Sequence, residues 1–421
     1  MATLVVIGNC ISLARRAGRG ESDIGVFLRS ARLLNEGAGP EFYAGRDAST
    51  GWYRTIPPVG LCLFQPLAGM DRAAGGSLWA LLNLGFLATA IFAIAKCLGR
   101  AEDPGGHVAG AFPWVVCVLL ILASASIQVG QFSLLFVACW LVSLAALLRG
   151  RPFCAGVGLA LPSAIKLYPA LMLAFPMVGP ARQGVRVIAG FVLGAILFVA
   201  TLPLVALGPR AHGLTMAFVR HAILGDDGRV AGYGLINADT VSSEGLDAVV
   251  MRYLTHGPGF HSIYPGVPHF RLDHQVALRL AHLLRAAILL ATIVATLRLR
   301  CRSDRRPRDT LIQSAALWSA AMYVMLPETK ARYAVYTILA FIPLVLLASR
   351  AKMEANRAAL VGWSAAIVFC LAMVLQVHPP SLRAFGLGYL GPLLLWGLNV
   401  SQSMARQPSA DEARPPSPGA G

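Results

Sequence analysis

The stretch 78–97 has the sequence LWALLNLGFLATAIFAIAKC, and its single charged side chain, Lys96, lies next to its end. A helix rises about 1.5 Å per residue, so a stretch of this length crosses the roughly 30 Å hydrocarbon core of a bilayer. Apolar stretches of similar character recur along the chain, at 112–128, 133–149, 186–207, 281–299, 311–326, 333–349, 358–376 and 383–399. They predict an all-helical protein that crosses a membrane many times.

The composition supports the same fold class. The 421 residues are 56% hydrophobic and 13% charged, with a mean hydropathy of +0.64, whereas a soluble domain has about 25% charged residues. A soluble enzyme is therefore excluded. The net charge is +16, and arginines that flank apolar spans are what the positive-inside rule predicts. We therefore expect a lipid bilayer, and no nucleic acid, as the partner of these charges.

Basic residues beside the apolar stretches predict the topology. The positive-inside rule assigns the loops that carry them to the cytoplasm. These residues are Arg149 and Arg151, Arg182 and Arg186, the run from Arg298 to Arg308, and the group Arg350, Lys352 and Arg357. With a short first helix before Arg15, this gives about twelve spans and places both chain ends in the cytoplasm.

The segment from Phe153 to Val178 is apolar, yet basic residues precede and follow it, and Lys166 and Pro169 interrupt its middle. We expect a hairpin of two short helices with Lys166 and Tyr168 at its tip. Broken helices at membrane depth are tolerated where they line a protein-enclosed or water-filled cavity. The tip is therefore a candidate part of a polar site.

The expected organisation is one transmembrane domain over residues 1–400, with outer loops at 15–77 and 208–280. A tail at 401–421, rich in proline, serine and alanine, is predicted to be disordered and cytoplasmic. The first outer loop holds an amphipathic stretch from Ile24 to Leu34, which predicts a helix that lies along the membrane surface.

Polar residues gather on the predicted outer side. Charged groups at membrane depth are costly, so their placement is informative. The outer set comprises Asp23, Gln128, Gln131, Lys166, Asp226, Asp227, Arg252, Glu328, Lys330, Arg332 and His378. A transport path favours ionisable groups near the bilayer midplane and two similar halves, and the sequence shows neither pattern. The placement favours a reaction at the outer membrane surface over the alternative, a lipid or solute transporter with an outward-facing cavity.

The order of the outer residues resembles a known family. The first outer loop carries Asp23, Tyr43, Tyr53, Pro57-Pro58, Pro66-Leu67, Trp79 and Asn83. This pattern is similar to that of the bacterial polytopic alpha-mannosyltransferases of the GT-C class, which use polyprenyl-phosphate-mannose. Gly130-Gln131, Lys166-x-x-Pro169 and the region from Asn237 to Arg252 then match, in order, the family's Gly-Gln-x-Asn, Lys-x-x-Pro and Asn-x-Ser motifs. The resemblance covers residues 20–350.

The sequence departs from the family pattern at three places. Ile56 replaces the first residue of the family's Tyr-Pro-Pro, and Ser133 replaces the asparagine of Gly-Gln-x-Asn. The stretch from Glu328 to Tyr333 stands where the family has a Trp-x-His segment. The acceptor and the sugar are therefore less well defined than the general reaction class.

The resemblance implies a GT-C-like bundle and an inverting glycosyltransferase. It would transfer a hexosyl group, with mannose as the first candidate, from a polyprenyl-phosphate donor to a hydroxyl of a glycolipid or glycan. The reaction would take place on the outer face of the cytoplasmic membrane. No cofactor is implied, although a divalent metal is not excluded. Asp23 would be the catalytic general base; the alternative is that Ser22 or Asp23 caps a helix.

The remaining site residues follow from the same resemblance. Lys166 would bind the donor phosphate, because a fixed cation stabilises the charge of the leaving group, and Arg252, Lys330 and Arg332 are further candidates. The alternatives are a snorkelling lysine and lipid-headgroup cations. Sugar or acceptor contacts are assigned to Gln131, Gln128, Tyr53 and Tyr168. Polar contacts between helices and an interfacial aromatic belt are the corresponding alternatives.

The sequence predicts no metal site. Asp226-Asp227 lies between glycines, as in a solvated turn. The histidines His256, His261, His269 and His274 lack the spacing of metal ligands on one helix, so they are interpreted as surface or acceptor-binding residues. Glycine-rich phosphate loops are also absent, which argues against a nucleotide-dependent enzyme or pump.

Overall fold

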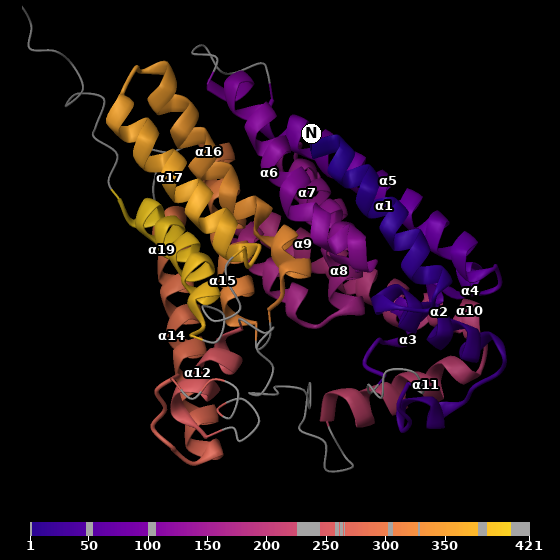
Figure 1. Ribbon diagram of the computed structural model, residues 1–421. Helices are drawn as coiled ribbons and strands as arrows, with labels where there is room; N and C mark the ends of the chain where they lie inside the picture. Colours follow the sequence, from indigo (N-terminus) through magenta and orange to yellow (C-terminus); the bar gives the residue numbers. More distant parts are fainter. Residues whose placement is uncertain are drawn as a thin grey trace, which may run out of the picture.

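The computed structural model describes residues 2–47, 54–99, 107–224, 245–256, 261, 264, 266–301, 306–326, 329–377 and 385–405. Within these ranges the secondary-structure elements are all helical (Figure 1). Six helical segments are long and apolar enough to cross a membrane. They are α5 (Arg72–Leu98), α6 (His107–Val129), the continuous segment Ala181–Leu207, α14 (His274–Arg300), Ala331–Lys352 and α17 (Arg357–Val374). The polytopic all-helical prediction is confirmed, whereas the count of about twelve spans stays a prediction.

Shorter helices complete the described structure. The segment Ala181–Leu207 consists of α9 (Ala181–Ala195), η3 (Ile196–Thr201) and α10 (Leu202–Leu207), and the segment Ala331–Lys352 joins η5 (Ala331–Thr337) to α16 (Ile338–Met353). The others are α1 (Ala2–Gly18), α2 (Ser22–Asn35), η1 (Pro40–Tyr43), α3 (Pro58–Cys62), α4 (Gln65–Ala68), α7 (Ser133–Leu148), α8 (Pro152–Ile165), η2 (Tyr168–Val178), α11 (Arg210–Phe218), η4 (Val219–Leu224), α12 (Leu246–Leu254), α15 (Pro307–Met325), η6 (Leu387–Tyr389) and α19 (Leu390–Met404). Because α19 continues to Met404, the predicted tail starts inside a helix, and residues 406–421 lie outside the described ranges.

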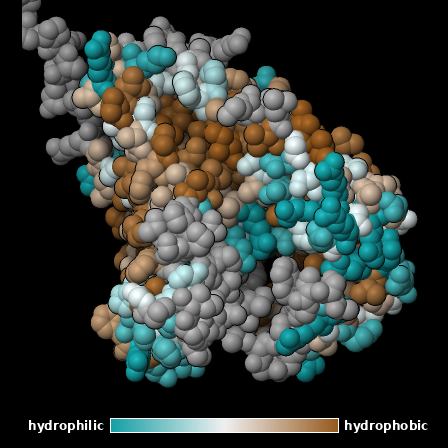
Figure 2. All heavy atoms as spheres, viewed as in Figure 1, coloured by the Kyte–Doolittle hydropathy of each residue, from teal (hydrophilic) through white to brown (hydrophobic). Residues whose placement is uncertain are grey.

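The long helices form a bundle with polar segments at one end. In Figure 1, α1, α5, α6, α7 and α8 form one side of the bundle, and α14 to α19 form the other. The helices α2, α3 and α11 lie at the lower right of this view, and α12 lies at the lower left, beside α14. Figure 2 shows an apolar surface across the bundle and hydrophilic residues around that lower end. The bundle therefore has the surface of a membrane protein, with its loop helices at the polar end.

Burial separates the central span from the peripheral ones. The Ala331–Lys352 span is 78% buried, whereas α17 is 11% buried. An apolar helix that is exposed along its length is suited to lipid, because hydrocarbon solvates its side chains as well as a protein interior does. The start of the central span therefore lies inside the protein, where the site described below is built.

The interruption at Lys166 is confirmed. Helix α8 ends at Ile165, Lys166 has an extended backbone with φ −141° and ψ 141°, and η2 follows as a 3-10 helix packed against α8. Pro169 lacks an N–H donor and disfavours a helical residue before it, so the chain does not continue α8 through this point. Lys166 thus occupies the tip of the expected hairpin.

The amphipathic helix α2 forms as predicted, but its apolar face packs on protein and not on lipid. Ile24, Phe27 and Leu28 are buried in the main hydrophobic core. The Phe27 ring centroid lies 5.1 Å from that of Phe64 and 5.3 Å from that of Phe132. These aromatic partners come from the first loop and from the α6–α7 turn, which periodicity within α2 does not reveal. Helix α2 therefore closes one end of the bundle.

Helices α8 and α9 approach each other through glycines. A Cβ atom added at Gly156 would lie 2.0 Å from the carbonyl oxygen of Val187, and one added at Gly190 would lie 2.1 Å from that of Phe153. Gly194, one turn further, faces Ala160 and Val157. Small residues at such spacing let helix backbones meet in a membrane, where van der Waals packing drives helix association.

We expect Gly190→Ala to lower the thermal stability of the protein in detergent, because the added methyl must separate α8 from α9. Overpacking of this kind costs about 1–3 kcal/mol. Gly85→Ala in α5 is the matched control, since a Cβ at Gly85 meets no atom within 4 Å. The measurement is the unfolding temperature of both variants, and equal unfolding temperatures would refute the close contact.

Candidate active site

Asp23 lies in the first turn of α2 and is 5% exposed. The Nε2 amide of Gln131 donates a hydrogen bond to its Oδ2. Arg332 Nη1 lies 3.1 Å from the same oxygen and donates to Oδ1 at 3.4 Å. A buried carboxylate requires such partners, because an uncompensated charge in a protein interior is strongly destabilising. The three residues therefore form one buried, charge-compensated group.

The helix-cap alternative for Asp23 is wrong. The residue that precedes α2 is Glu21, which makes no capping hydrogen bond through its side chain. Ser22 has a φ of +66°, and its hydroxyl donates to the carbonyl oxygen of Val129 at 3.1 Å. The Asp23 carboxylate instead contacts residues from two distant parts of the chain.

The turn between α6 and α7 aims Gln131 at Asp23. Gly130 has a φ of +76°, which glycine adopts without strain. A Cβ atom there would lie 2.8 Å from the Cβ of Ile24 and 2.9 Å from Cδ1 of Leu13. The indole N–H of Trp79 donates to the Gly130 carbonyl at 3.0 Å. The positive φ and the close packing thus favour glycine at position 130, and the hydrogen bond to Asp23 uses the side-chain amide of Gln131.

Arg332 is held by polar contacts of its own backbone and of its helix. The Ser133 hydroxyl donates to the carbonyl oxygen of Arg332 at 3.3 Å and lies 3.2 Å from the hydroxyl of Tyr336. The Tyr336 hydroxyl is in turn 2.9 Å from that of Tyr168. Ser133 stands where the resembling family has asparagine, and here it links α7 to η5.

Lys166 contacts Tyr333, the residue that follows Arg332 in the sequence. Its Nζ is 4.7 Å from the Tyr333 ring centroid and 5.7 Å from that of Tyr168. These are cation–π distances, which favour a fixed position for the ammonium group. The adjacent residues Arg332 and Tyr333 therefore join the carboxylate group to the lysine group.

A cavity of about 260 Å³ opens beside Lys166. Apart from Lys166 and a few hydroxyl groups its lining is apolar, and it includes Pro57, Pro58, Val59, Ile165, Phe218 and Ile223. The paired prolines and the Lys-x-x-Pro tip thus border one space. A cation at the edge of an apolar cavity is suited to an amphiphile with an anionic group.

Other predicted residues are placed elsewhere or lie outside the described ranges. Arg252 is fully buried on α12, which Figure 1 places apart from α2. Its role as a phosphate ligand therefore stays a prediction that the geometry around Lys166 does not support. Lys330 and Gln128 are half-buried, Lys330 directly before η5 and Gln128 near the end of α6. The residues outside the described ranges are Tyr53, Asp226, Asp227, Asn237, Glu328 and His378.

Sequence reasoning missed two features of this site. Arg332 was considered only as a phosphate ligand, whereas its guanidinium pairs with Asp23. Tyr336 was not considered, although Tyr333 and Tyr336 are three residues apart and their rings stack with centroids 5.8 Å apart. The sequence signal for Tyr336 is its spacing of three residues from Tyr333, which places both side chains on one face of the helix that follows Lys330.

The comparison with protein families places the chain in a known family. The model of glycosyltransferase family 87 matches residues 55–327, which is well over half of the chain. The match includes Gln131, Lys166 and the cavity residues, while Asp23 and Arg332 lie on either side of it. Neither a curated protein nor a solved structure matches the chain. The chain belongs to glycosyltransferase family 87 and is a membrane glycosyltransferase.

Proposed function

We propose that this glycosyltransferase moves a hexosyl group, with mannose as the first candidate, from a polyprenyl-phosphate donor to an acceptor hydroxyl with inversion. The acceptor is a glycolipid or glycan at the outer face of the cytoplasmic membrane, and no cofactor takes part. The observation that carries the proposal is a series of contacts: the buried Asp23 carboxylate pairs with Arg332, and the ring of the next residue, Tyr333, contacts Lys166, which borders an apolar cavity.

Asp23 acts as the general base. Each carboxylate oxygen has two lone-pair sites, and Oδ1 accepts a single long hydrogen bond from Arg332, so it retains capacity for the acceptor hydroxyl. The proton moves late, when attack on the anomeric carbon has made the hydroxyl acidic.

The bond changes are those of a single displacement. The acceptor oxygen forms a bond to the anomeric carbon as the bond from that carbon to the phosphate oxygen breaks. The leaving polyprenyl phosphate takes the electron pair, and Asp23 takes the acceptor proton. Attack from the face opposite the phosphate inverts the anomeric configuration. Gln131 keeps Asp23 in place and presents its amide carbonyl to a sugar hydroxyl.

Lys166 and the adjacent cavity suit the donor. The lysine ammonium neutralises the phosphate as its charge develops, and the neighbouring tyrosine rings hold that ammonium in place. The apolar cavity accommodates the part of the lipid chain nearest the phosphate, while the rest of the chain stays in the bilayer. Tyr168 then lies between the cation and the sugar, where its ring can stack on an apolar sugar face.

The proposed donor class is tested with purified protein in liposomes. Labelled polyprenyl-phosphate-mannose, polyprenyl-phosphate-arabinose and a nucleotide-linked hexose are each supplied with extracted membrane glycolipids. We expect transfer from a lipid-linked donor, mannose giving the highest rate, and none from the nucleotide sugar. Transfer from the nucleotide sugar alone would overturn the donor assignment and leave the glycosyltransferase class intact.

We expect Asp23→Asn to remain folded and to lose sugar transfer by a factor of about 10² or more, as removal of a general base does. Asp47→Asn is the matched control, since Asp47 is equally buried, at 5% exposure, and pairs with Arg29 at 3.0 Å. Initial rates of both variants are compared at equal amounts of folded protein. Equal losses in the two variants would reduce Asp23 to a structural ion pair.

We expect Lys166→Met to weaken donor binding about tenfold or more, because it removes a charged partner of the phosphate and keeps the length of the side chain. Lys96→Met is the control, since Lys96 also lies over an aromatic ring, 5.0 Å from the Phe92 centroid, but in α5. Binding of labelled polyprenyl phosphate to the protein in detergent is measured by equilibrium dialysis. Unchanged affinity in Lys166→Met would remove Lys166 from the phosphate site.

A further inference from the structure

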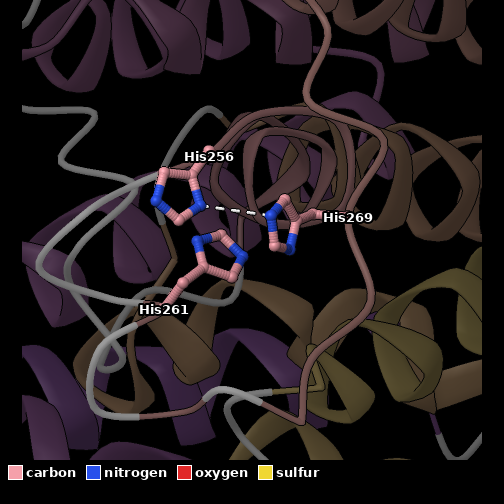
Figure 3. Close-up of side chains that lie close together, drawn as sticks. All are labelled: His256, His261 and His269. Carbon is pink, nitrogen blue, oxygen red and sulfur yellow. Dashed lines mark hydrogen bonds between the residues drawn. The ribbon is translucent and has the colours of Figure 1, made fainter.

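Three imidazole rings meet beyond the end of α12. His256 follows this helix directly, His269 lies before α14, and His261 lies between them in the sequence. One ring nitrogen from each histidine lies within 4.8 Å of the other two. Figure 3 shows the three rings turned toward a common centre. The cluster is separate from the group around Asp23 and from the cavity beside Lys166.

Backbone carbonyls fix the tautomers of two of these rings. Nε2 of His261 lies 3.2 Å from the carbonyl oxygen of Arg252, and Nδ1 of His269 lies 3.3 Å from that of Val267. A carbonyl oxygen only accepts, so these two nitrogens carry the protons. The other nitrogen of each ring, on the side of the cluster, then has the lone pair. Metal-binding histidines are oriented in this way, by an outer N–H bond to a carbonyl or carboxylate.

One pair of these nitrogens has the spacing of metal ligands. Nδ1 of His256 and Nε2 of His269 are 3.1 Å apart. In a tetrahedral zinc site with Zn–N bonds of about 2.0–2.1 Å, neighbouring ligand nitrogens are roughly 3.3–3.4 Å apart. A movement of a few tenths of an ångström therefore converts this contact into one edge of a coordination tetrahedron.

We propose that His256, His261 and His269 bind a divalent transition metal ion, zinc being the closest fit, with water at the fourth position. Neutral imidazoles are preferred ligands of zinc, and three of them leave one position open. The His256 side chain is exposed and gives the ion a route from solvent, whereas His261 is 5% exposed and anchors the site.

Two features near the site act on a bound cation in opposite directions: the C-terminus of α12 attracts it, and Arg271 repels it. The last carbonyl groups of α12 carry the partial negative charge of a helix C-terminus, which stabilises a nearby cation. The positive charge of Arg271 acts on His256 and disfavours a metal ion at this position. The ion would tie the segment that leaves α12 to the segment that enters α14.

The test uses the full-length protein in detergent, with any polyhistidine tag removed. The protein is loaded with Zn²⁺, dialysed extensively, and its metal content is measured by mass spectrometry. We expect close to stoichiometric zinc in the wild type and in His212→Ala, which removes an exposed histidine of α11. We expect the zinc to be lost from the double variant His256→Ala, His269→Ala. Absence of zinc from the wild type, or its retention by the double variant, would overturn the proposal.

A second measurement, of the unfolding temperature, distinguishes the loss of zinc binding from a folding defect in the variants. Zn²⁺ is expected to raise the unfolding temperature of the wild type and of His212→Ala, but not that of His256→Ala alone. Because the His256 side chain is exposed, its removal leaves no cavity, and the metal-free unfolding temperature should be unchanged. Substitution with Co²⁺ should give the visible absorption of a tetrahedral site in the wild type only. An equal zinc-dependent shift in His256→Ala would contradict the assignment.

Discussion

The buried negative charge of Asp23 is the constraint on which this end of the bundle depends. A carboxylate removed from water is tolerated only with a countercharge and hydrogen-bond donors, and the loss of such partners costs several kcal/mol. Gln131 and Arg332 supply them from the α6–α7 turn and from the start of η5. Three chain segments are thus held in one arrangement by a single side chain, and the tight packing at Gly130 and Ser133 serves this arrangement.

The membrane explains why the chemistry lies at one end. Spans that face hydrocarbon can carry few polar groups, so polar side chains collect at helix ends and at breaks in helices. Four polar residues lie at such junctions: Asp23 in the first turn of α2, Gln131 between α6 and α7, Lys166 between α8 and η2, and Arg332 at the start of η5. The breaks also free backbone from regular helices, which lets η2 and η5 approach each other through Tyr168 and Tyr336.

Features that depend on neighbouring residues, such as helix positions, could be predicted from the sequence, whereas contacts between residues far apart in the sequence could not. Most predicted apolar spans coincide with helices to within one or two residues, because length and hydropathy are local; the span 383–399 begins outside the described residues and is helical from Leu387. The break at Lys166 follows from a lysine and a proline close in sequence. The Asp23–Arg332 pair joins residues 309 positions apart, so local sequence does not reveal it. The fold excludes the helix-cap interpretation, and the role of Asp23 as a base stays a proposal. The three histidines escaped prediction because their ligand atoms come from irregular segments, where no helical spacing relates them.

The adjacency of Arg332 and Tyr333 has a consequence for how this enzyme can diversify. Arg332 contacts the proposed base, Tyr333 contacts the lysine of the proposed phosphate site, and one peptide bond joins these two residues. A shift in the position of either residue during evolution would therefore move the other. The cavity beside Lys166 is different, since its walls come mainly from α3, the end of α8, η3, α11 and η4, none of which supplies a partner of Asp23. Selection, or an engineer, can therefore remodel the shape of the proposed donor cavity while the proposed reacting centre is inherited intact.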